Sequence, residues 1–176
     1  MARIDLPGEG SDLERVWSLS PDLGAAVGNL AGKVGGKGLD LPWRVREAAR
    51  MRIAQINGCN VCLQWRFPEM ADRGVTEELY AQLDDPANGD YSEQELLAIE
   101  YADKFATDHR SLDDAFFARL RAAFTDAEIV ELTAMIGNWL AFGRFQAVLD
   151  VAEACAWAPP SETVPSAEPV DEKVGV

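Results

Sequence analysis

The strongest structural signal lies in residues 46–67, REAARMRIAQINGCNVCLQWRF. Apolar residues recur there and at the position just before it at helical spacing, and they predict a helix with one buried stripe, made by Val45, Ala48, Ala49, Ile53 and Ile56. Asn57-Gly58 is a typical helix C-terminus, because glycine adopts the left-handed conformation that ends many helices. A second helix is therefore expected to begin near Cys59.

Cys59 and Cys62 would then occupy the first turn of that second helix. The free N–H groups and the helix dipole favour a thiolate there, and the thiolate is the nucleophilic form of cysteine. Arg66 follows Cys62 by four residues, so we expect it on the same helix face, where its charge would stabilise the Cys62 thiolate. Trp65 is expected beside them, on the substrate side. The spacing predicts a reactive thiol pair.

Two other interpretations of the pair, and one of Glu47, remain open. A Cys-x-x-Cys pair can be half of a zinc site, but the other candidate ligands, His109 and Cys155, are isolated in the sequence, so no metal is expected. The two thiols could also be inert core residues. Eleven residues separate Glu47 from the first cysteine, and Glu47 could form an ordinary ion pair with Arg44 or Arg50.

Helix signals recur along the rest of the chain, and strand signals do not. Two capping boxes, Ser92 with Glu95 and Thr125 with Glu128, each precede an apolar helical stripe. The longest helix is expected to follow the second box and to span about residues 126–154. These signals predict an all-α bundle.

The length of 176 residues fits one domain. Residues 1–12 are polar and contain Gly and Pro, which predicts a flexible N-terminal arm. Residues 158–176 are rich in proline and acids, which is typical of a disordered tail. The helical domain is therefore expected to span residues 13–157.

The charge excludes several functions. With a formal net charge of −14 and one histidine, the chain lacks the basic surface that nucleic acids and anionic membranes require.

The N-terminus does not resemble a secretory signal, and the most apolar stretch, residues 132–142, is too short to span a bilayer. A cytoplasmic location is expected, where a close cysteine pair is more often reactive or metal-binding than a structural disulfide.

The motif Glu-x11-Cys-x2-Cys, formed by Glu47, Cys59 and Cys62, resembles that of the alkylhydroperoxidase D-like (AhpD-like) branch of the carboxymuconolactone decarboxylase family. Softer similarities are the segments ELLAIEYADKFATD and FTDAEIVELTAMIG, and together they cover most of residues 47–151. The resemblance implies an all-helical bundle with the Cys-x-x-Cys at a helix N-terminus, whose protomers assemble into dimers, trimers or hexamers.

The resemblance also implies a peroxidase cycle without a cofactor. Cys62 would attack the peroxide and become a sulfenic acid, and Cys59 would condense with it to a disulfide. Glu47 would accept and return the proton. A lipoyl or thioredoxin-like dithiol protein would then reduce the disulfide.

This chain departs from the peroxidase pattern at two positions. Val61 and Arg66 stand where the best-matched peroxidases have histidines. Arginine holds a charge but does not relay protons, because its pKa exceeds about 12. Three alternatives therefore stay open: disulfide exchange, a cofactor-free carboxymuconolactone-decarboxylase-type enzyme, and a non-enzymatic redox switch.

Overall fold

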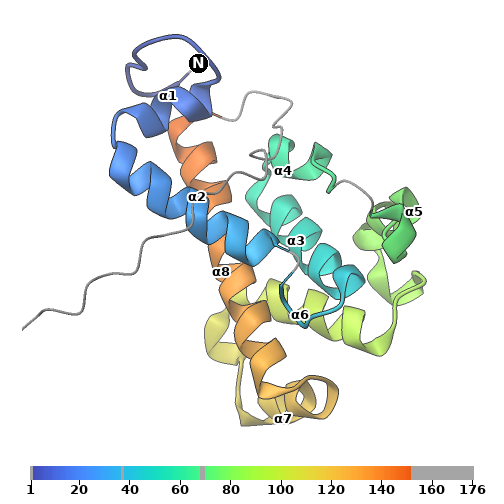
Figure 1. Ribbon diagram of the computed structural model, residues 1–176. Helices are drawn as coiled ribbons and strands as arrows, with labels where there is room; N and C mark the ends of the chain where they lie inside the picture. The colour runs from blue at the N-terminus through green and yellow to red at the C-terminus, as the bar shows by residue number, and fades with distance from the viewer. Residues whose placement is uncertain (1, 37, 68–69, 152–176) are drawn as a thin grey trace, which may run out of the picture.

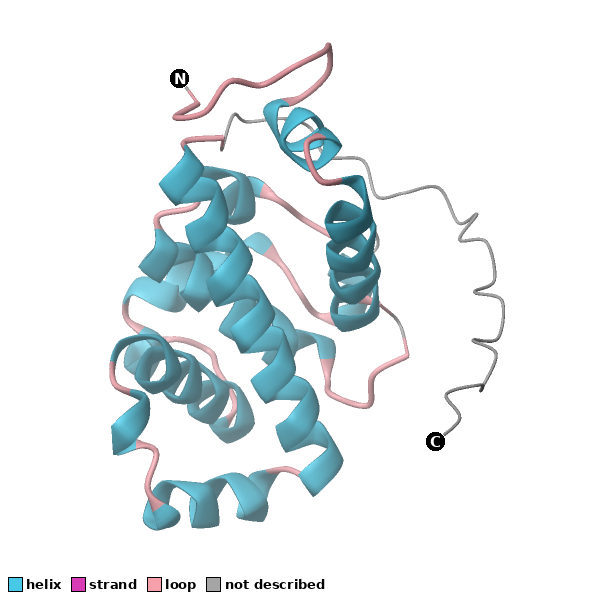
Figure 2. Cartoon of the chain, turned by 90° about the vertical axis from the view of Figure 1, so that its left-hand side faces the viewer, coloured by secondary structure: helices cyan, strands magenta, loops and turns pink. Residues whose placement is uncertain are grey.

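The computed structural model describes residues 2–36, 38–67 and 70–151. Every regular element in these residues is helical, which confirms the predicted all-α fold (Figures 1 and 2). The α-helices are α1 Asp12–Ser18, α2 Pro21–Gly35, α3 Trp43–Asn57, α4 Asn60–Gln64, α5 Glu77–Ala81, α6 Glu93–Thr107, α7 Asp114–Ala123 and α8 Asp126–Leu149. Within the described residues, no helix is both long enough and apolar enough to cross a membrane.

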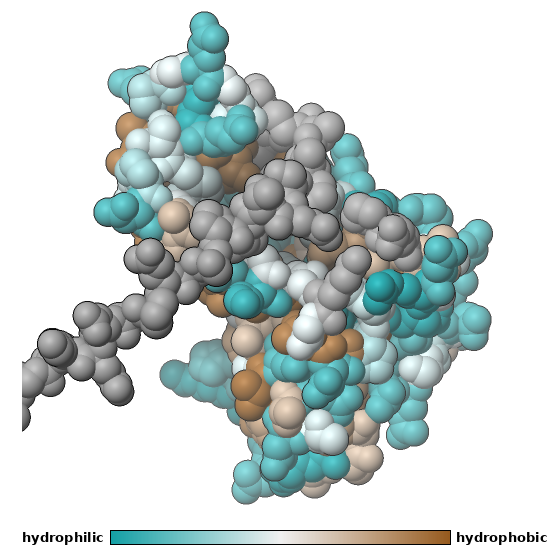
Figure 3. All heavy atoms as spheres, viewed as in Figure 1, coloured by the Kyte–Doolittle hydropathy of each residue, from teal (hydrophilic) through white to brown (hydrophobic). Residues whose placement is uncertain are grey.

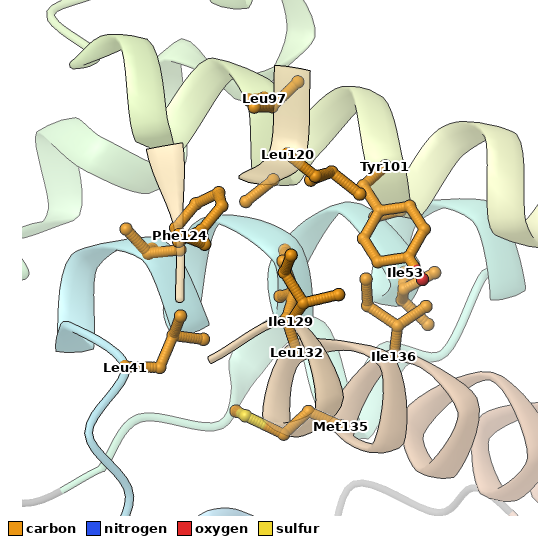
Figure 4. Close-up of a cluster of buried hydrophobic side chains, with 14 of the residues drawn as sticks. Leu41, Ile53, Leu97, Tyr101, Leu120, Phe124, Ile129, Leu132, Met135 and Ile136 are labelled. Atoms are coloured by element: carbon orange, nitrogen blue, oxygen red, sulfur yellow. The ribbon is translucent and has the colours of Figure 1, made fainter. Parts of the chain in front are cut away.

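Helix α3 forms the centre of the molecule and packs against α6 and α8 (Figure 1). The main core lies where these helices meet α7, and Figure 4 shows its side chains converging from all four. Its labelled members are Leu41, Ile53, Leu97, Tyr101, Leu120, Phe124, Ile129, Leu132, Met135 and Ile136. A smaller cluster joins Met51 and Ala54 of α3 to Leu79 and Tyr80 of α5. The sequence predicted one buried apolar stripe on α3, but the helix is buried on more than that one face.

The predicted end of α3 is confirmed. The helix ends at Asn57, and Gly58 follows in the left-handed region with φ 60°. The Gly58 N–H donates to the carbonyls of Ala54 and Gln55, and this turn directs the chain into α4. Glycine at this position therefore sets the angle between the two helices that carry the motif.

Both predicted capping boxes are also confirmed. The N–H of Glu95 donates to Ser92 Oγ at 3.2 Å, and its carboxylate accepts the Ser92 N–H at 2.9 Å. Thr125 and Glu128 form the same reciprocal pair at the start of α8.

The predicted end of α8 is wrong by about five residues. The helix ends at Leu149, because Asp150 adopts the left-handed conformation with φ 53° and its N–H closes the last turn on Ala147 and Gln146. Aspartate tolerates this conformation better than most side chains do. The end of the predicted helical domain and the predicted tail, residues 158–176, lie outside the described residues.

The segment before α1 makes defined contacts with the end of α8. The Arg3 N–H donates to the Leu149 carbonyl at 2.9 Å, and the Arg3 guanidinium donates to the Val148 carbonyl at 3.1 Å. Arg15 of α1 donates to the carbonyls of Leu6 and Pro7. Helix α1 starts at Asp12, the last residue of the predicted arm.

Candidate functional site: a thiol pair beside a buried ion pair

The cysteine pair lies at the start of α4, as the motif predicts. Cys59 is the N-cap residue, and its Sγ accepts the backbone N–H of Cys62 at 3.4 Å. The Cys59 N–H donates back to the Ala54 carbonyl at 3.1 Å, which joins α4 to the last turn of α3. The local sequence thus brings both thiols into one turn.

The two sulfurs are free thiols in direct contact, 2.7 Å apart. The hydrogen bond between them lowers the pKa of Cys59 to about 6, against the effect of burial. The same hydrogen bond, together with burial, raises the pKa of Cys62. Cys59 is 1% exposed, whereas Cys62 is half-buried. The inner sulfur is therefore the one that favours the thiolate form, and the outer sulfur is the more accessible one.

Glu47 is buried in an ion pair with Arg50. The guanidinium donates two hydrogen bonds to the carboxylate, both at 2.8 Å, and the two side chains are 1% and 2% exposed. The Tyr80 hydroxyl of α5 donates a third at 2.7 Å. Of the two predicted ion-pair partners, Arg50 is the one the structure shows, whereas Arg44 binds Glu95.

Arg50 also connects this ion pair to the thiol turn. Its guanidinium donates to the Cys62 carbonyl at 2.6 Å and to the Trp65 carbonyl at 3.2 Å. Its positive charge favours the thiolate form of both cysteines, which lowers their pKa values, although for Cys62 the bond to Cys59 outweighs it. Among the described residues, the hydrogen-bond partners of the Glu47 carboxylate are Arg50 and Tyr80, and Arg50 is the one that also bonds to the thiol turn.

The prediction that Trp65 and Arg66 continue the helix of Cys62 is wrong. Helix α4 ends at Gln64, and Trp65 is extended with ψ 135°. In a longer helix the Cys62 carbonyl would accept the Arg66 N–H, but it accepts from Arg50 instead.

Arg66 consequently lies away from the predicted helix face. Its guanidinium binds the Glu77 carboxylate at 2.7 and 2.9 Å and lies 4.1 Å from the centre of the Tyr80 ring. Trp65 packs against Phe67, with ring centres 4.0 Å apart.

An open pocket of about 360 Å³ lies between α3 and α5. Its lining comprises Met51, Gln55, Leu63, Arg66, Glu77, Tyr80 and Ala81. Tyr80 contributes to this wall and also binds Glu47, so it links the pocket to the buried ion pair. Sequence reasoning missed Tyr80, which is 33 residues from Glu47 and belongs to no motif. In the described part of the chain, no three His, Cys, Asp or Glu side chains converge as a metal site.

A pH titration of the reduced protein is expected to show two well-separated thiol ionisations. As the pH rises, one thiolate should form near pH 6, where Cys59 loses its proton, and the second should form above the ordinary thiol value of about 8.5. Thiolate ultraviolet absorbance measures this in a Cys155→Ser background, so that only the pair titrates. In the Cys62→Ala variant the lower midpoint should move upward, because burial then acts without the hydrogen bond. If both thiols ionised near the ordinary thiol pKa of about 8.5, the result would contradict the hydrogen bond between the two sulfurs.

Helix α8 approaches the thiol turn through Gly143. The Asn57 side chain donates to the carbonyls of Trp139 and Leu140 at 3.1 and 3.4 Å. A Cβ at Gly143 would lie 2.3 Å from the Asn57 Nδ2 atom. One turn further along α8, the Gln146 Oε1 atom lies 3.9 Å from the Cys59 sulfur. The absence of a side chain at Gly143 thus allows α8 to close over the end of α3.

Gly143→Ala is expected to lower the free energy of unfolding by about 1–2 kcal/mol, because the clash displaces Asn57 and exceeds the gain in helix propensity. Chemical denaturation measures the change. Gly137→Ala in the same helix is the matched control, since its Cβ would meet Phe105 at an ordinary 3.8 Å. The control should keep or slightly raise the stability, and equal effects of the two substitutions would contradict the close packing at Gly143.

The fold and the site together define a class of protein: an all-α bundle with a free Cys-x-x-Cys pair at a helix start, beside a buried glutamate. The chain is 32% identical over 138 residues to the uncharacterized protein YnjA of Escherichia coli K12, and the match covers 78% of this chain and 76% of that protein. It belongs to one family with that protein, and its fold is that of AhpD-like proteins, the carboxymuconolactone decarboxylase-type fold. No protein-family model matches it.

Solved structures share the fold. A protein of unknown function from Agrobacterium tumefaciens, ATU0492, related by name to the antioxidant defence protein AhpD, superposes with a TM-score of 0.66 at 26% identity, over 85% of this chain and 96% of that one. A peroxidase-related protein from Ralstonia eutropha JMP134 gives 0.62 at 17% identity, over 80% and 75%. The debrominase Bmp8, as a variant in complex with 2,3,4-tribromopyrrole, gives 0.66 at 23% identity, over 81% and 76%. The last two likenesses concern the fold alone.

Proposed function

We propose that this protein is a thiol-dependent oxidoreductase that reduces organic or hydrogen peroxides through a Cys59–Cys62 disulfide. The observation that carries the proposal is the contact between the two sulfurs, 2.7 Å apart, with one buried and one half-buried. The outer thiol can meet a small substrate, and the inner one can close a disulfide without a rearrangement of the main chain.

The hydrogen bond between the Cys59 and Cys62 sulfurs supports a definite order of events. Cys62 passes its proton to the Cys59 sulfur, and the Cys62 thiolate attacks one peroxide oxygen. The O–O bond breaks, Cys62 becomes a sulfenic acid, and the alcohol or water leaves with the proton held by Cys59. The Cys59 thiolate then attacks the Cys62 sulfur, and the S–O bond breaks. Hydroxide leaves and takes a proton from solvent, so two thiols become one disulfide while one peroxide is reduced.

In this scheme Cys59 takes the proton-accepting part that the family resemblance implies for Glu47. The Glu47 carboxylate already accepts three hydrogen bonds, two from Arg50 and one from Tyr80. We propose that Glu47 assists by holding the Arg50 charge against the thiol turn. This division of roles needs neither of the motif histidines, whose positions hold Val61 and Arg66.

The cycle closes with a dithiol reductant, a lipoyl or thioredoxin-like protein, in a reducing compartment such as the cytoplasm. Attack on the Cys62 sulfur of the disulfide is supported by its greater exposure. A partner thiolate would form a mixed disulfide with Cys62, and its second thiol would release the reduced pair.

The test is an anaerobic titration of the reduced protein with hydrogen peroxide and with an organic hydroperoxide, read by free-thiol count and intact mass. One equivalent should remove two thiols and two mass units, mapped to Cys59–Cys62, faster than it oxidises a free thiol. Oxidation no faster than that of a free thiol would overturn the proposal.

The same preparation separates the alternatives. Activity that survives alkylation of both thiols would favour the cofactor-free decarboxylase-type enzyme. Oxidation that changes the sedimentation coefficient without catalytic turnover would favour the redox switch.

A further inference from the structure

The open pocket between α3 and α5 combines apolar walls with one ion pair. The apolar part of its lining consists of Met51, Leu63, Ala81 and the ring of Tyr80. The two charged residues of the lining are Arg66 and Glu77, which bind each other. Figure 3 shows mainly hydrophilic surface where Figure 1 places α5, so the apolar walls differ from the surface around them. The volume of about 360 Å³ lies in the range of small-molecule pockets, roughly 300–1,000 Å³.

The Arg66 guanidinium is held in place by groups other than Glu77. Its Nη1 atom donates to the carbonyls of Leu63 and Trp65 at 2.7 and 3.0 Å. The guanidinium also lies 4.1 Å from the centre of the Tyr80 ring, close enough for a cation–π interaction. The Nε and Nη2 atoms form the remaining edge, which is the edge that binds a carboxylate through two parallel hydrogen bonds. This edge is therefore positioned whether or not Glu77 occupies it.

Glu77 is the loosely held member of the pair. Its side chain is 72% exposed, against 33% for Arg66, and among the described residues Arg66 is its hydrogen-bond partner. An exposed ion pair contributes little, because ordering the side chains offsets most of the attraction. A ligand carboxylate that also buries an apolar body against the pocket walls gains the hydrophobic effect, which Glu77 does not supply. Glu77 is therefore a carboxylate that a ligand can displace.

The pocket lies beside the thiol turn. Leu63 of its wall follows Cys62 directly in α4. Cys62 itself packs against the small hydrophobic cluster that supplies Met51 and Tyr80 to the pocket. A ligand anchored at Arg66 therefore places its apolar body next to the turn that contains the reactive pair.

We propose that this pocket binds an organic carboxylate, whose carboxylate group takes the place of Glu77 on Arg66. The apolar body of the ligand then lies against the walls. Resting on the proposed function, the substrate class is an organic hydroperoxide that carries a carboxylate at the end remote from its O–O bond. The reaction leaves the carboxylate unchanged and reduces the hydroperoxide to the alcohol, while the two thiols become a disulfide.

The first test is isothermal titration calorimetry of the reduced full chain with para-isopropylbenzoate, which has no peroxide group, and with the neutral para-isopropylbenzamide. The wild type should bind the carboxylate more tightly than the amide. Glu77→Gln should increase this preference at least several-fold, because the competing charge on Arg66 is gone. Arg66→Gln should weaken carboxylate binding on the order of tenfold. Circular dichroism verifies folding, and the Glu77 variant decides the question if Arg66→Gln does not fold.

Glu78→Gln is the matched control. Glu78 is the next residue of α5 and is exposed, but it lies outside the pocket lining. This variant therefore removes the same charge from the chain without freeing Arg66, and it should bind the carboxylate as the wild type does. If Glu78→Gln and Glu77→Gln tighten binding equally, the effect comes from the net charge and the carboxylate site is overturned. Absence of carboxylate binding in both the wild type and Glu77→Gln also overturns it.

A second test compares cumene hydroperoxide with its para-carboxylate, two substrates that differ in one group. Glu77→Gln should lower the KM of the carboxylate substrate, relative to that of cumene hydroperoxide, at least several-fold. If the benzoate binds as described but neither hydroperoxide reacts faster than with a free thiol, the proposed function fails and the carboxylate site stands. If both hydroperoxides are reduced but Glu77→Gln has no selective effect, the substrate class is overturned and the proposed function stands.

Discussion

Cys62→Ser is expected to abolish peroxide-driven disulfide formation and to lower the second-order rate constant with peroxide on the order of 10³-fold or more. Serine preserves the size of the side chain and its place in α4, but its hydroxyl does not ionise near neutral pH. It can therefore neither attack the peroxide oxygen nor form the sulfenic acid. Stopped-flow mixing with peroxide, followed by tryptophan fluorescence or thiol count, measures the loss.

Cys59→Ser separates the two sulfurs. It should still consume one equivalent of peroxide at Cys62, more slowly because Cys59 no longer accepts the Cys62 proton, and should stop at the sulfenic acid, which excess peroxide then carries to the irreversible sulfinic acid. Cys155→Ser should behave as the wild type does. If Cys59→Ser loses the first step while Cys62→Ser retains it, the roles of the two cysteines are the reverse of those proposed.

The second large effect is on stability. Arg50→Leu should lower the free energy of unfolding by about 3–5 kcal/mol, because it leaves the buried Glu47 carboxylate without its counter-charge. It also removes the hydrogen bonds to the carbonyls of Cys62 and Trp65. Urea denaturation at neutral pH measures the first consequence, and the thiol titration measures the second.

Two controls make this result specific. The double variant Glu47→Leu with Arg50→Leu should recover much of the stability, since no uncompensated charge remains buried. Arg119→Leu removes a guanidinium from the exposed pair with Glu100 and should leave the stability nearly unchanged. An Arg50→Leu variant as stable as Arg119→Leu would contradict the structural role assigned to the buried pair.

Features encoded by neighbouring residues could be predicted from the sequence. The end of α3 at Asn57-Gly58, the capping boxes and the thiol turn each depend on contacts within a few residues, where local preference decides the conformation.

Features that depend on tertiary packing could not be predicted in this way. Arg44 and Arg50 stand at the same spacing on either side of Glu47, and only burial beside α5 selects Arg50. The early end of α4 agrees with the local signal of a proline at position 68 of the sequence, but the donor that takes the Cys62 carbonyl is Arg50, a side chain twelve residues away that the sequence did not identify. Arg66 stands where the family pattern has a histidine, but its guanidinium binds the Glu77 carboxylate. The sequence position alone therefore did not predict where this side chain lies.

The N-cap of α4 has a consequence for how the protein responds to its own oxidation. The atom that anchors this short helix, the Cys59 sulfur, is also the atom that changes its bonding during the reaction. A thiolate is a strong acceptor for the Cys62 N–H, whereas a disulfide sulfur carries no charge and accepts poorly. An N-cap contributes on the order of 1 kcal/mol, which is substantial for a single turn of helix. Oxidation therefore replaces the hydrogen bond that caps this turn with a covalent link between the same two residues, so the start of α4 is held by different forces in the two redox states.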